Sequence, residues 1–522
     1  MGRFFNTTGP CNSNDHYVLD TKTRLVGSDL NRYIQSKLYW VLHAPRQTGK
    51  TTFLQSWMHE INTKGEAIAC YVSVERCQGF PDADVAIPGV CNAINEFASK
   101  SLPETYIPEI PNSDTTSLLS NMLYNWAKQV APKPLIVLFD EVDTLQDQAM
   151  ISFLRQLRSG FADRGVGKYP VSVALVGMRD LRDYIIKSKD GVSLNPGSPF
   201  NIKENSVTLS NFTQKDVFDL IGQHVDETGQ KFEKEAIELI YNLTQGQPWL
   251  VNALAKKCVW EIVPEEQGET VTTEHIMIAK EKLIQSRAVH LDSLAERLRD
   301  PRVKHIIETI ITGDIDPNMA DGDDFVLCTD LGLVTAKSGT PEIANPIYRE
   351  VIGRVLTQGM QLAIPQPQFK WQNDDGSLDY DALFEEFQSF WRLHAETWES
   401  KVDYQEAFPH LLVMAFLQRI VNGGGEILRE YAAGRGRVDL AVKWQNIWTV
   451  IEVKIVHPRF GFKTTLEEGL KQTAKYRDIV GAKAAWLVIF DRREKSRKKP
   501  WEQRLTKKQH QTQGGTITVI TC

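Results

Sequence analysis

The chain has 522 residues, more than a single hydrophobic core usually organises, so several domains are expected. Its apolar fraction of 42% and charged fraction of 24% are typical of a globular protein. With neither a membrane-length apolar run nor a signal-peptide pattern, the sequence predicts a cytoplasmic protein without a membrane partner. The formal net charge of -6 argues against a protein that coats nucleic acid non-specifically. Seven cysteines without a C-x-x-C pair argue against structural zinc.

The first strongly patterned segment follows the apolar run 38–42. It reads His43, Ala44, Pro45, Arg46, Gln47, Thr48, Gly49, Lys50, Thr51 and Thr52. A strand, a loop and a helix that begins near Lys50 place backbone N–H groups against phosphates. Lys50 then reaches the β and γ phosphates, and Thr51 offers its hydroxyl to Mg²⁺. This segment resembles the Walker A pattern of an ATP site, with the small residue Ala44 at the position of its first glycine.

A second segment predicts the strand that completes such a site. Residues 134–139 form a continuous apolar run that ends in Asp140 and Glu141. Such a run predicts a buried parallel strand whose carboxyl end reaches a site. It resembles a Walker B strand, which implies that Asp140 holds Mg²⁺, mostly through water, and that Glu141 orients the attacking water. The plainer alternative is a buried strand whose acidic end only caps the next helix.

Two further features extend this resemblance. A predicted strand at 171–177 is followed by Arg179, and Pro248 lies in the first turn of a later helix. These features resemble the AAA+ and STAND classes of P-loop ATPases. The resemblance implies that Arg179 senses the γ-phosphate and that Pro248 approaches the nucleotide, whereas a structural alternative pairs Arg179 with a nearby aspartate. In this class the segment before the first P-loop strand, here residues 5–19, often builds the adenine pocket.

The order of elements predicts an α/β protein. We expect a P-loop ATPase with a parallel sheet, a helical lid and a winged-helix-like module, followed by a further domain with a mixed sheet. The predicted boundaries are 1–205 for the ATPase core, 206–286 for the lid, 287–360 for the winged-helix-like module, 361–378 for a linker and 379–522 for the last domain. Winged-helix modules bind DNA in some proteins and only join domains in others.

The last domain carries two carboxylates and a lysine in a pattern suited to phosphodiester cleavage. Residues 448–455 predict a strand, and because side chains two apart share a face, Glu452 and Lys454 point the same way. Residues 438–442 predict the preceding hairpin strand, which brings Asp439 beside Glu452. The carboxylates form an oxygen-rich pocket for Mg²⁺ or Mn²⁺, and Lys454 adds a positive charge. The plainer alternative is an ordinary ion pair on a half-exposed strand.

This pattern resembles the PD-(D/E)xK nuclease superfamily over roughly the last quarter of the chain, which implies that 379–522 is a PD-(D/E)xK mixed-sheet nuclease domain. The resemblance implies that Gln472 and Tyr476, four apart on one helix face, form the Q-x-x-x-Y element of RecB-like members. It also implies an acidic metal ligand from the first core helix, for which Glu406 is the candidate and Glu426 and Glu430 are weaker alternatives. A valine, rather than the proline of the family name, precedes the aspartate of this motif.

Positive charge is concentrated near the end of the sequence. From Val480 to Cys522 ten lysines and arginines stand against three aspartates and glutamates. A basic loop beside a nuclease site is suited to contact phosphates, whereas most charge runs are solvated loops.

Together these features predict an ATP-regulated, metal-dependent nuclease that uses ATP and Mg²⁺ or Mn²⁺ and acts on nucleic acid, with DNA as the expected substrate. Several fusions of this kind act in antiviral defence or in mobile elements, which is an argument by analogy. A competing hypothesis is a STAND-like switch that assembles into a homo-oligomer on binding ATP and uses its C-terminal domain as a binding or effector module. A DNA-translocating motor is a third hypothesis, but the sequence has no helicase motif set to support it.

Overall fold

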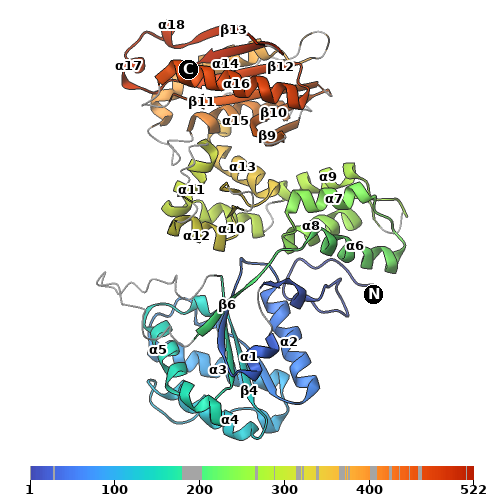
Figure 1. Ribbon diagram of the computed structural model, residues 1–522, viewed down its shortest axis with the longest axis vertical. Coiled ribbons are helices and arrows are strands. Elements are labelled where there is room, and N and C mark those ends of the chain that lie inside the picture. Colours follow the sequence, from blue (N-terminus) through green and yellow to red (C-terminus); the bar gives the residue numbers. More distant parts are fainter. Residues whose placement is uncertain are drawn as a thin grey trace. The chain divides into compact units, whose positions relative to one another are not determined.

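The computed structural model describes most of the backbone. The described residues are 2–26, 30–178, 203–264, 268–286, 289–312, 319, 322–336, 340–363, 371, 373, 375, 377–399, 408–421, 426–433, 436–445, 447–456, 461–512 and 514–522. Within these ranges the side chains of 166, 203–205, 289, 292, 312, 358–363, 394–399, 418–421, 426–433 and 436–439 are not described. The chain divides into two compact units (Figure 1). The first comprises Met1–Ser286, Val326–Thr335 and Ala344–Pro346, and the second comprises Arg287–Phe325, Ala336–Ile343 and Ile347–Cys522.

The first unit is built on a six-stranded sheet with the order β1-β6-β2-β5-β4-β3. Its strands are β1 (Leu25–Val26), β2 (Tyr39–His43), β3 (Ile68–Ser73), β4 (Leu135–Asp140), β5 (Ser172–Gly177) and β6 (Lys203–Leu209). Neighbouring strands pair in parallel, except that the edge strand β1 runs antiparallel to β6. The three predicted apolar runs thus become the adjacent strands β2, β5 and β4, and their carboxyl ends meet at one edge of the sheet.

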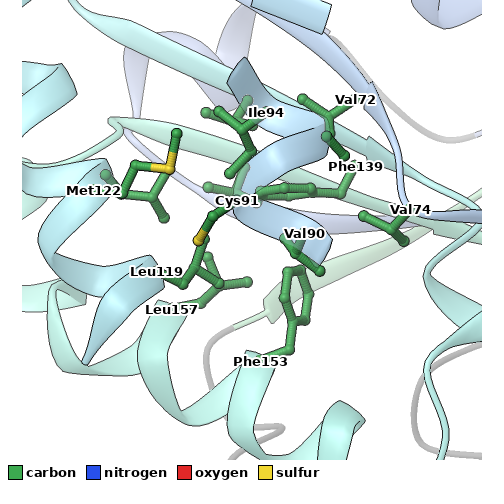
Figure 2. Close-up of a cluster of buried hydrophobic side chains, with 14 of the residues drawn as sticks. Val72, Val74, Val90, Cys91, Ile94, Leu119, Met122, Phe139, Phe153 and Leu157 are labelled. Atoms are coloured by element: carbon green, nitrogen blue, oxygen red, sulfur yellow. The ribbon is translucent and has the colours of Figure 1, made fainter. Parts of the chain in front are cut away.

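Helices cover both faces of this sheet. They are α1 (Leu30–Gln35), α2 (Lys50–Lys64), α3 (Ala83–Ser101), α4 (Leu118–Val130) and α5 (Asp147–Ser159). Side chains of β2 alternate, so Tyr39 and Val41 join the core beneath α3, α4 and α5, while Trp40 and Leu42 join the core beneath α1 and α2. Figure 2 shows the first of these cores, with Phe139 of β4 among helix side chains. Burial on both faces explains the continuous apolar runs.

The segment after β6, for which a lid is predicted, is helical. It contains α6 (Gln214–Thr228), α7 (Lys234–Thr244), α8 (Pro248–Lys257), a π-helical turn (Cys258–Ile262) and α9 (Thr273–Gln285). Short 3-10 turns in the first unit are η1 (Thr21–Arg24), η2 (Glu75–Cys77), η3 (Glu104–Tyr106), η4 (Val142–Thr144) and η5 (Phe161–Val166). Gly246 precedes α8 with a φ of 70°, and an added Cβ would lie 1.9 Å from the carbonyl oxygen of Phe212. Glycine is therefore required at this bend.

The segment after the lid combines helices with a short hairpin. Its elements are α10 (Val289–Arg297), α11 (Pro301–Thr312), α12 (Asp323–Asp330), β7 (Val334–Thr335), β8 (Glu342–Ile343) and α13 (Pro346–Ala363). The strands β7 and β8 form a two-stranded sheet. The winged-helix-like module predicted for this segment stays a prediction, as do the other domain boundaries. None of the helices in the described ranges is long and apolar enough to cross a membrane.

The last domain is built on a mixed six-stranded sheet with the order β13-β14-β12-β11-β10-β9. Its elements are α14 (Tyr380–Glu399), α15 (Phe408–Val421), β9 (Glu426–Ala433), β10 (Gly436–Trp444), β11 (Ile447–Ile455), α16 (Gly461–Val480), β12 (Ala484–Phe490), α17 (Glu494–Arg497), α18 (Trp501–Arg504), β13 (Thr506–Thr512) and β14 (Gly515–Thr521). The strands β9, β10 and β11 form an antiparallel meander, and β11, β12 and β14 are parallel. This mixed sheet fits the predicted order of elements.

The two faces of this sheet have different covers. On one face Leu487 packs against α16, and the fit is so close that a Cβ on Gly469 would lie 2.8 Å from its Cδ2 atom. On the other face Trp486 lies 4.5 Å, between ring centroids, from Phe384 of α14. Because adjacent residues of β12 point to opposite faces, the sheet is a middle layer between α16 and the α14–α15 pair.

Candidate functional site

The P-loop of the first unit turns directly from β2 into α2. Gly49 has a φ of 96°, which glycine adopts without strain, and it caps α2 without a side chain, so the first N–H groups of the helix face outward. The Lys50 side chain is buried, and its Nζ atom donates to the carbonyl oxygens of Ala44 at 2.7 Å and Pro45 at 3.0 Å. Burial lowers the pKa of Lys50. An ammonium beside the N–H groups of a helix N-terminus is an anion site of the predicted kind.

The predicted metal-binding oxygens lie together at the edge of the sheet. The hydroxyl of Thr51 donates to Asp140 Oδ2 at 2.7 Å, and Asp140 is fully buried at the end of β4. The Tyr71 hydroxyl of β3 donates to the same oxygen at 3.1 Å, while the N–H of Glu141 donates to Oδ1 at 3.0 Å. Carboxylate and hydroxyl oxygens are hard ligands that fit Mg²⁺. Sequence reasoning missed Tyr71 because it lies within an apolar strand.

Glu141 follows Asp140 in an uncommon backbone conformation. Its φ of 60° is left-handed, which costs free energy for a residue with a Cβ and places the carboxylate beyond the end of the strand. Burial, followed by the nearby charges of Asp140 and Asp143, raises the pKa of Glu141 to about 7. A carboxylate with this pKa exchanges protons near neutral pH, as a group that orients and deprotonates water requires.

A cavity of about 310 Å³ opens beside the P-loop. Eight of the predicted residues line it, namely Arg46, Gln47, Thr48, Gly49, Lys50, Thr51, Thr52 and Glu141. Its apolar part is formed by Tyr17, Val18, Leu19, Phe212, Leu220, Pro248 and Trp249. Pro45 is not among the lining residues, and its carbonyl oxygen accepts from Thr48 and Lys50. An apolar slot next to a phosphate loop is suited to a nucleoside triphosphate.

The opening segment of the chain closes one side of this cavity. The N–H of Cys11 donates to the Thr52 hydroxyl at 3.0 Å, and Trp249 of α8 donates through its indole N–H to the Thr7 carbonyl oxygen at 2.8 Å. The segment therefore bridges the P-loop helix and the lid. Sequence position alone indicated a role for residues 5–19, and eight residues of this range, from Asn6 to Leu19, are among those that line the cavity.

One arginine that sequence reasoning missed holds the P-loop from η1. Arg24 is 4% exposed, and its Nη2 atom donates to the carbonyl oxygens of Thr48 at 2.7 Å and Ser210 at 2.6 Å. Its guanidinium lies 4.7 Å from the ring centroid of Phe212, and burial lowers its pKa to about 10. Within a polar stretch of sequence such an arginine looks like a surface residue. The predicted sensor Arg179 lies outside the described residues.

Comparison with known protein families shows to which family the chain belongs. A family model described as an AAA-like domain matches residues 31–352, more than half of the chain. The chain belongs to this AAA-like family. Its front part is thus a P-loop ATPase, which confirms that part of the prediction, and ATP is the nucleotide expected in the cavity. A search of curated proteins found no match.

Solved structures similar to the AAA-like ATPase are distant in sequence. A Walker-type ATPase of Pyrococcus abyssi is 15% identical with a TM-score of 0.47, and the match covers 67% of this chain and 99% of that one. Cdc6p from Pyrobaculum aerophilum is 13% identical with a TM-score of 0.35, covering 63% and 91%. The RuvB Holliday junction branch migration motor of Thermotoga maritima is 12% identical with a TM-score of 0.33, covering 62% and 91%.

The second candidate site lies on β11 in the last domain of the AAA-like ATPase. Glu452 is 2% exposed, and Lys454 Nζ lies 2.9 Å from its Oε1 atom. Val450, two residues earlier on the same face, packs against Tyr476 of α16. Glu452 is also in register with Leu487, which packs beneath α16. The carboxylate and the ammonium therefore lie on the face that α16 covers.

Two predicted metal ligands of this site, Asp439 and Glu406, have no described side chain. Leu440 pairs with Ile451 in the antiparallel ladder, and continuing this register by one residue sets the backbone of Asp439 opposite Glu452. The side chain of Asp439 and the whole of Glu406 lie outside the described residues. Among the described residues, no three His, Cys, Asp or Glu side chains gather into a metal site. These ligands stay predictions.

The predicted helix pair occupies two different environments. Tyr476 is 9% exposed and packs into the sheet, whereas Gln472 is exposed. The helix α16 connects two parallel strands and must run back along β11. Four residues of a helix span about 6 Å, which nearly equals the roughly 6.6 Å spanned by two residues of a strand. Because Tyr476 packs over Val450, Gln472 lies at the level of Glu452. The two residues lie one turn apart on α16, and only the tyrosine is buried.

Proposed function

We propose that the AAA-like ATPase is an ATP-regulated, metal-dependent nuclease that cleaves phosphodiester bonds of DNA. The observation that carries the proposal is the buried Glu452 carboxylate with the Lys454 ammonium 2.9 Å away. An ordinary surface ion pair leaves both groups in water and contributes little, whereas desolvating a carboxylate costs several kcal/mol. A buried charge of this kind supports a functional role over the plainer ion pair.

In the proposed reaction each predicted residue of the β11 site has a defined role. Glu452, Asp439 and Glu406 would hold Mg²⁺ or Mn²⁺, because carboxylate oxygens suit these hard cations. When bound, such an ion polarises the phosphate and lowers the pKa of water. Lys454 holds the attacking water or a phosphate oxygen through its ammonium. Gln472 and Tyr476 line the pocket from α16, the glutamine from its exposed side and the tyrosine from beneath.

In this proposal the nucleotide site regulates the cutting. Support comes from covalent fusion and from the assembled nucleotide site, where Lys50, Thr51, Asp140 and Glu141 lie around one cavity edge. In the first unit, Thr51 and Asp140 would hold Mg²⁺, which neutralises phosphate charge when bound. Lys50 binds the β and γ phosphates, and Glu141 takes a proton from the attacking water. Arg179 is proposed to sense the γ-phosphate.

The test is cleavage of linear and circular DNA and of RNA by purified protein, with Mg²⁺ or Mn²⁺, in the presence and absence of ATP. Glu452→Ala should lower the cleavage rate by at least about 100-fold, as expected for loss of a group that stabilises the transition state. The control Glu385→Ala removes an exposed carboxylate that lies 3.6 Å from Lys507 and should cut like the wild type. Lys50→Ala should abolish the effect of ATP on cutting.

Three results would count against the proposal. Cutting by Glu452→Ala at the wild-type rate would show that β11 carries no nuclease site. Absence of cutting on every nucleic acid, with or without ATP, would favour the STAND-like switch, and light scattering with ATP would then test for a homo-oligomer. An ATP effect that survives in Lys50→Ala would show that the two sites are not coupled.

A further inference from the structure

A compact basic turn follows β12, and we call residues 491–499 the basic knuckle. Six of its nine residues are lysine or arginine, namely Arg492, Arg493, Lys495, Arg497, Lys498 and Lys499, against Asp491 and Glu494. Lys495 and Lys499 are exposed, and no ion pair to either is found among the described residues. The exposed positive charge of the knuckle therefore faces solvent.

The knuckle has a fixed shape, unlike a solvated charge run. Arg493 donates two side-chain hydrogen bonds to Asp491, at 2.7 Å from Nε to Oδ1 and 2.6 Å from Nη2 to Oδ2. The N–H of Asp491 donates to the Cys522 carbonyl oxygen at 3.0 Å. Ser496 is 7% exposed, and its N–H donates to the Arg493 carbonyl oxygen at 2.8 Å. These contacts tie the knuckle to the sheet at its start and hold α17 in place.

The knuckle lies at the end of the sheet that carries Lys454. Phe490, the last residue of β12, is in register with Ile455 of β11, so the knuckle begins beside the carboxyl end of β11. The Nη1 atom of Arg493 would lie 3.5 Å from a Cβ on Gly461, the first residue of α16. The basic turn is thus placed next to the strand end and the helix start that bound the Glu452 face.

We infer that the basic knuckle binds the phosphate backbone of duplex DNA beside the Glu452 site, an inference that rests on the proposed nuclease function. Proteins that bind single strands combine positive charge with aromatic rings on which bases stack. The only aromatic residue in 491–508 is Trp501, and its ring lies under the Arg504 guanidinium, 3.8 Å from centroid to Cζ. Charge without a free stacking surface suits the paired backbone of a duplex.

The test measures binding without cutting. In a Glu452→Ala background and without divalent metal, the anisotropy of labelled duplex DNA gives the affinity at salt concentrations from about 50 to 200 mM. Lys495→Ala with Lys499→Ala should make the slope of log K against log salt less steep by about 1.8, because each phosphate contact contributes about 0.9. The matched control Lys100→Ala with Lys234→Ala removes the same charge from the first unit and should leave the slope unchanged.

Each remaining outcome decides against part of the inference. An unchanged slope in the knuckle variant would show that the knuckle does not bind phosphates. A larger loss on single-stranded DNA than on duplex DNA would overturn the duplex assignment, and an equal loss on duplex RNA would overturn the preference for DNA. This assay needs no cleavage, so it is independent of the nuclease test. If the knuckle variant shows the expected slope change but the protein cuts no nucleic acid, the proposed nuclease function is wrong and the DNA-binding surface stands. If the protein cuts DNA but the slope is unchanged, the nuclease function stands and the knuckle inference is wrong.

Discussion

The two candidate sites differ in how far apart their parts lie along the chain. Apart from Glu406, the site on β11 takes its predicted residues from one hairpin and the following helix, so strand alternation and helical spacing are enough to bring Glu452, Lys454 and Tyr476 to one face. The nucleotide site combines the opening segment, η1, the P-loop, β4 and α8. Short-range rules can assemble the first kind of site, whereas the second depends on how distant segments pack.

The largest expected effect concerns the chemistry of the nucleotide site. Glu141→Gln should lower ATP hydrolysis by about 100-fold or more, the usual contribution of a positioned general base. Because the ionised carboxylate is the active form and its pKa is raised to about 7, wild-type hydrolysis should fall about tenfold per pH unit below pH 7. Initial rates of phosphate release between pH 5.5 and 8.5, a range of about three units around this pKa, measure both effects.

A second variant sharpens this prediction. The negative charge of Asp143 raises the pKa of Glu141. In the pH–rate profile of ATP hydrolysis, Asp143→Asn should therefore move the acid limb to lower pH. Asp82→Asn, which changes an exposed N-cap aspartate of α3, should leave the limb in place. A profile without an acid limb near pH 7 in the wild type would mean that Glu141 does not limit the rate.

The contrast between the sites also explains what could be predicted from the sequence. Runs of apolar residues predicted β2, β4 and β5 because buried parallel strands must be apolar on both faces. Lys50, Thr51 and Asp140 were predicted because their roles require particular side chains at strand ends. Arg24 was missed because burial of a single arginine depends on carbonyl oxygens far away in sequence, at Thr48 and Ser210.

At the site on β11, the pairing of the strands could be predicted, whereas the burial of individual side chains could not. The register between β10 and β11 agrees with the predicted hairpin, since hairpin pairing follows from turn position and side-chain alternation. Spacing alone did not distinguish the exposed Gln472 from the buried Tyr476, because both satisfy the same helical period. How deeply a helix face is covered depends on the sheet beneath it, which periodicity does not describe.

An intermediate effect is expected where a distant residue supports the P-loop. Arg24→Met keeps the length of the side chain but leaves the carbonyl oxygens of Thr48 and Ser210 without their buried donor. Unsatisfied buried groups cost about 1–3 kcal/mol each, so with two of them the free energy of unfolding of the first unit should fall by about 2–6 kcal/mol. Urea unfolding followed by tryptophan fluorescence measures the change, and ATP affinity should fall with it.

The control for this variant lies two residues away. Lys22→Met removes a cation whose ion pair with Glu60 is partly exposed, and pairs of this kind contribute at most about 1 kcal/mol. If both variants lose the same stability, burial of Arg24 has no special role, and the P-loop does not depend on η1.

The smallest expected effect tests whether Tyr71 belongs to the nucleotide site. Tyr71→Phe removes the hydroxyl that donates to Asp140 Oδ2 and keeps the ring in the core. Without this donor the carboxylate is less firmly aimed toward Thr51, and a hydrogen bond of about 1 kcal/mol corresponds to a roughly fivefold rise in the half-saturating Mg²⁺ concentration for ATP hydrolysis. The rate at saturating Mg²⁺ should stay close to wild type, because Tyr71 is proposed to act through Asp140 and to make no contact with ATP. The matched control is Tyr39→Phe, which removes a buried hydroxyl that donates to the Pro170 carbonyl oxygen at 3.1 Å, and a shift of equal size in that variant would assign the effect to packing of the sheet.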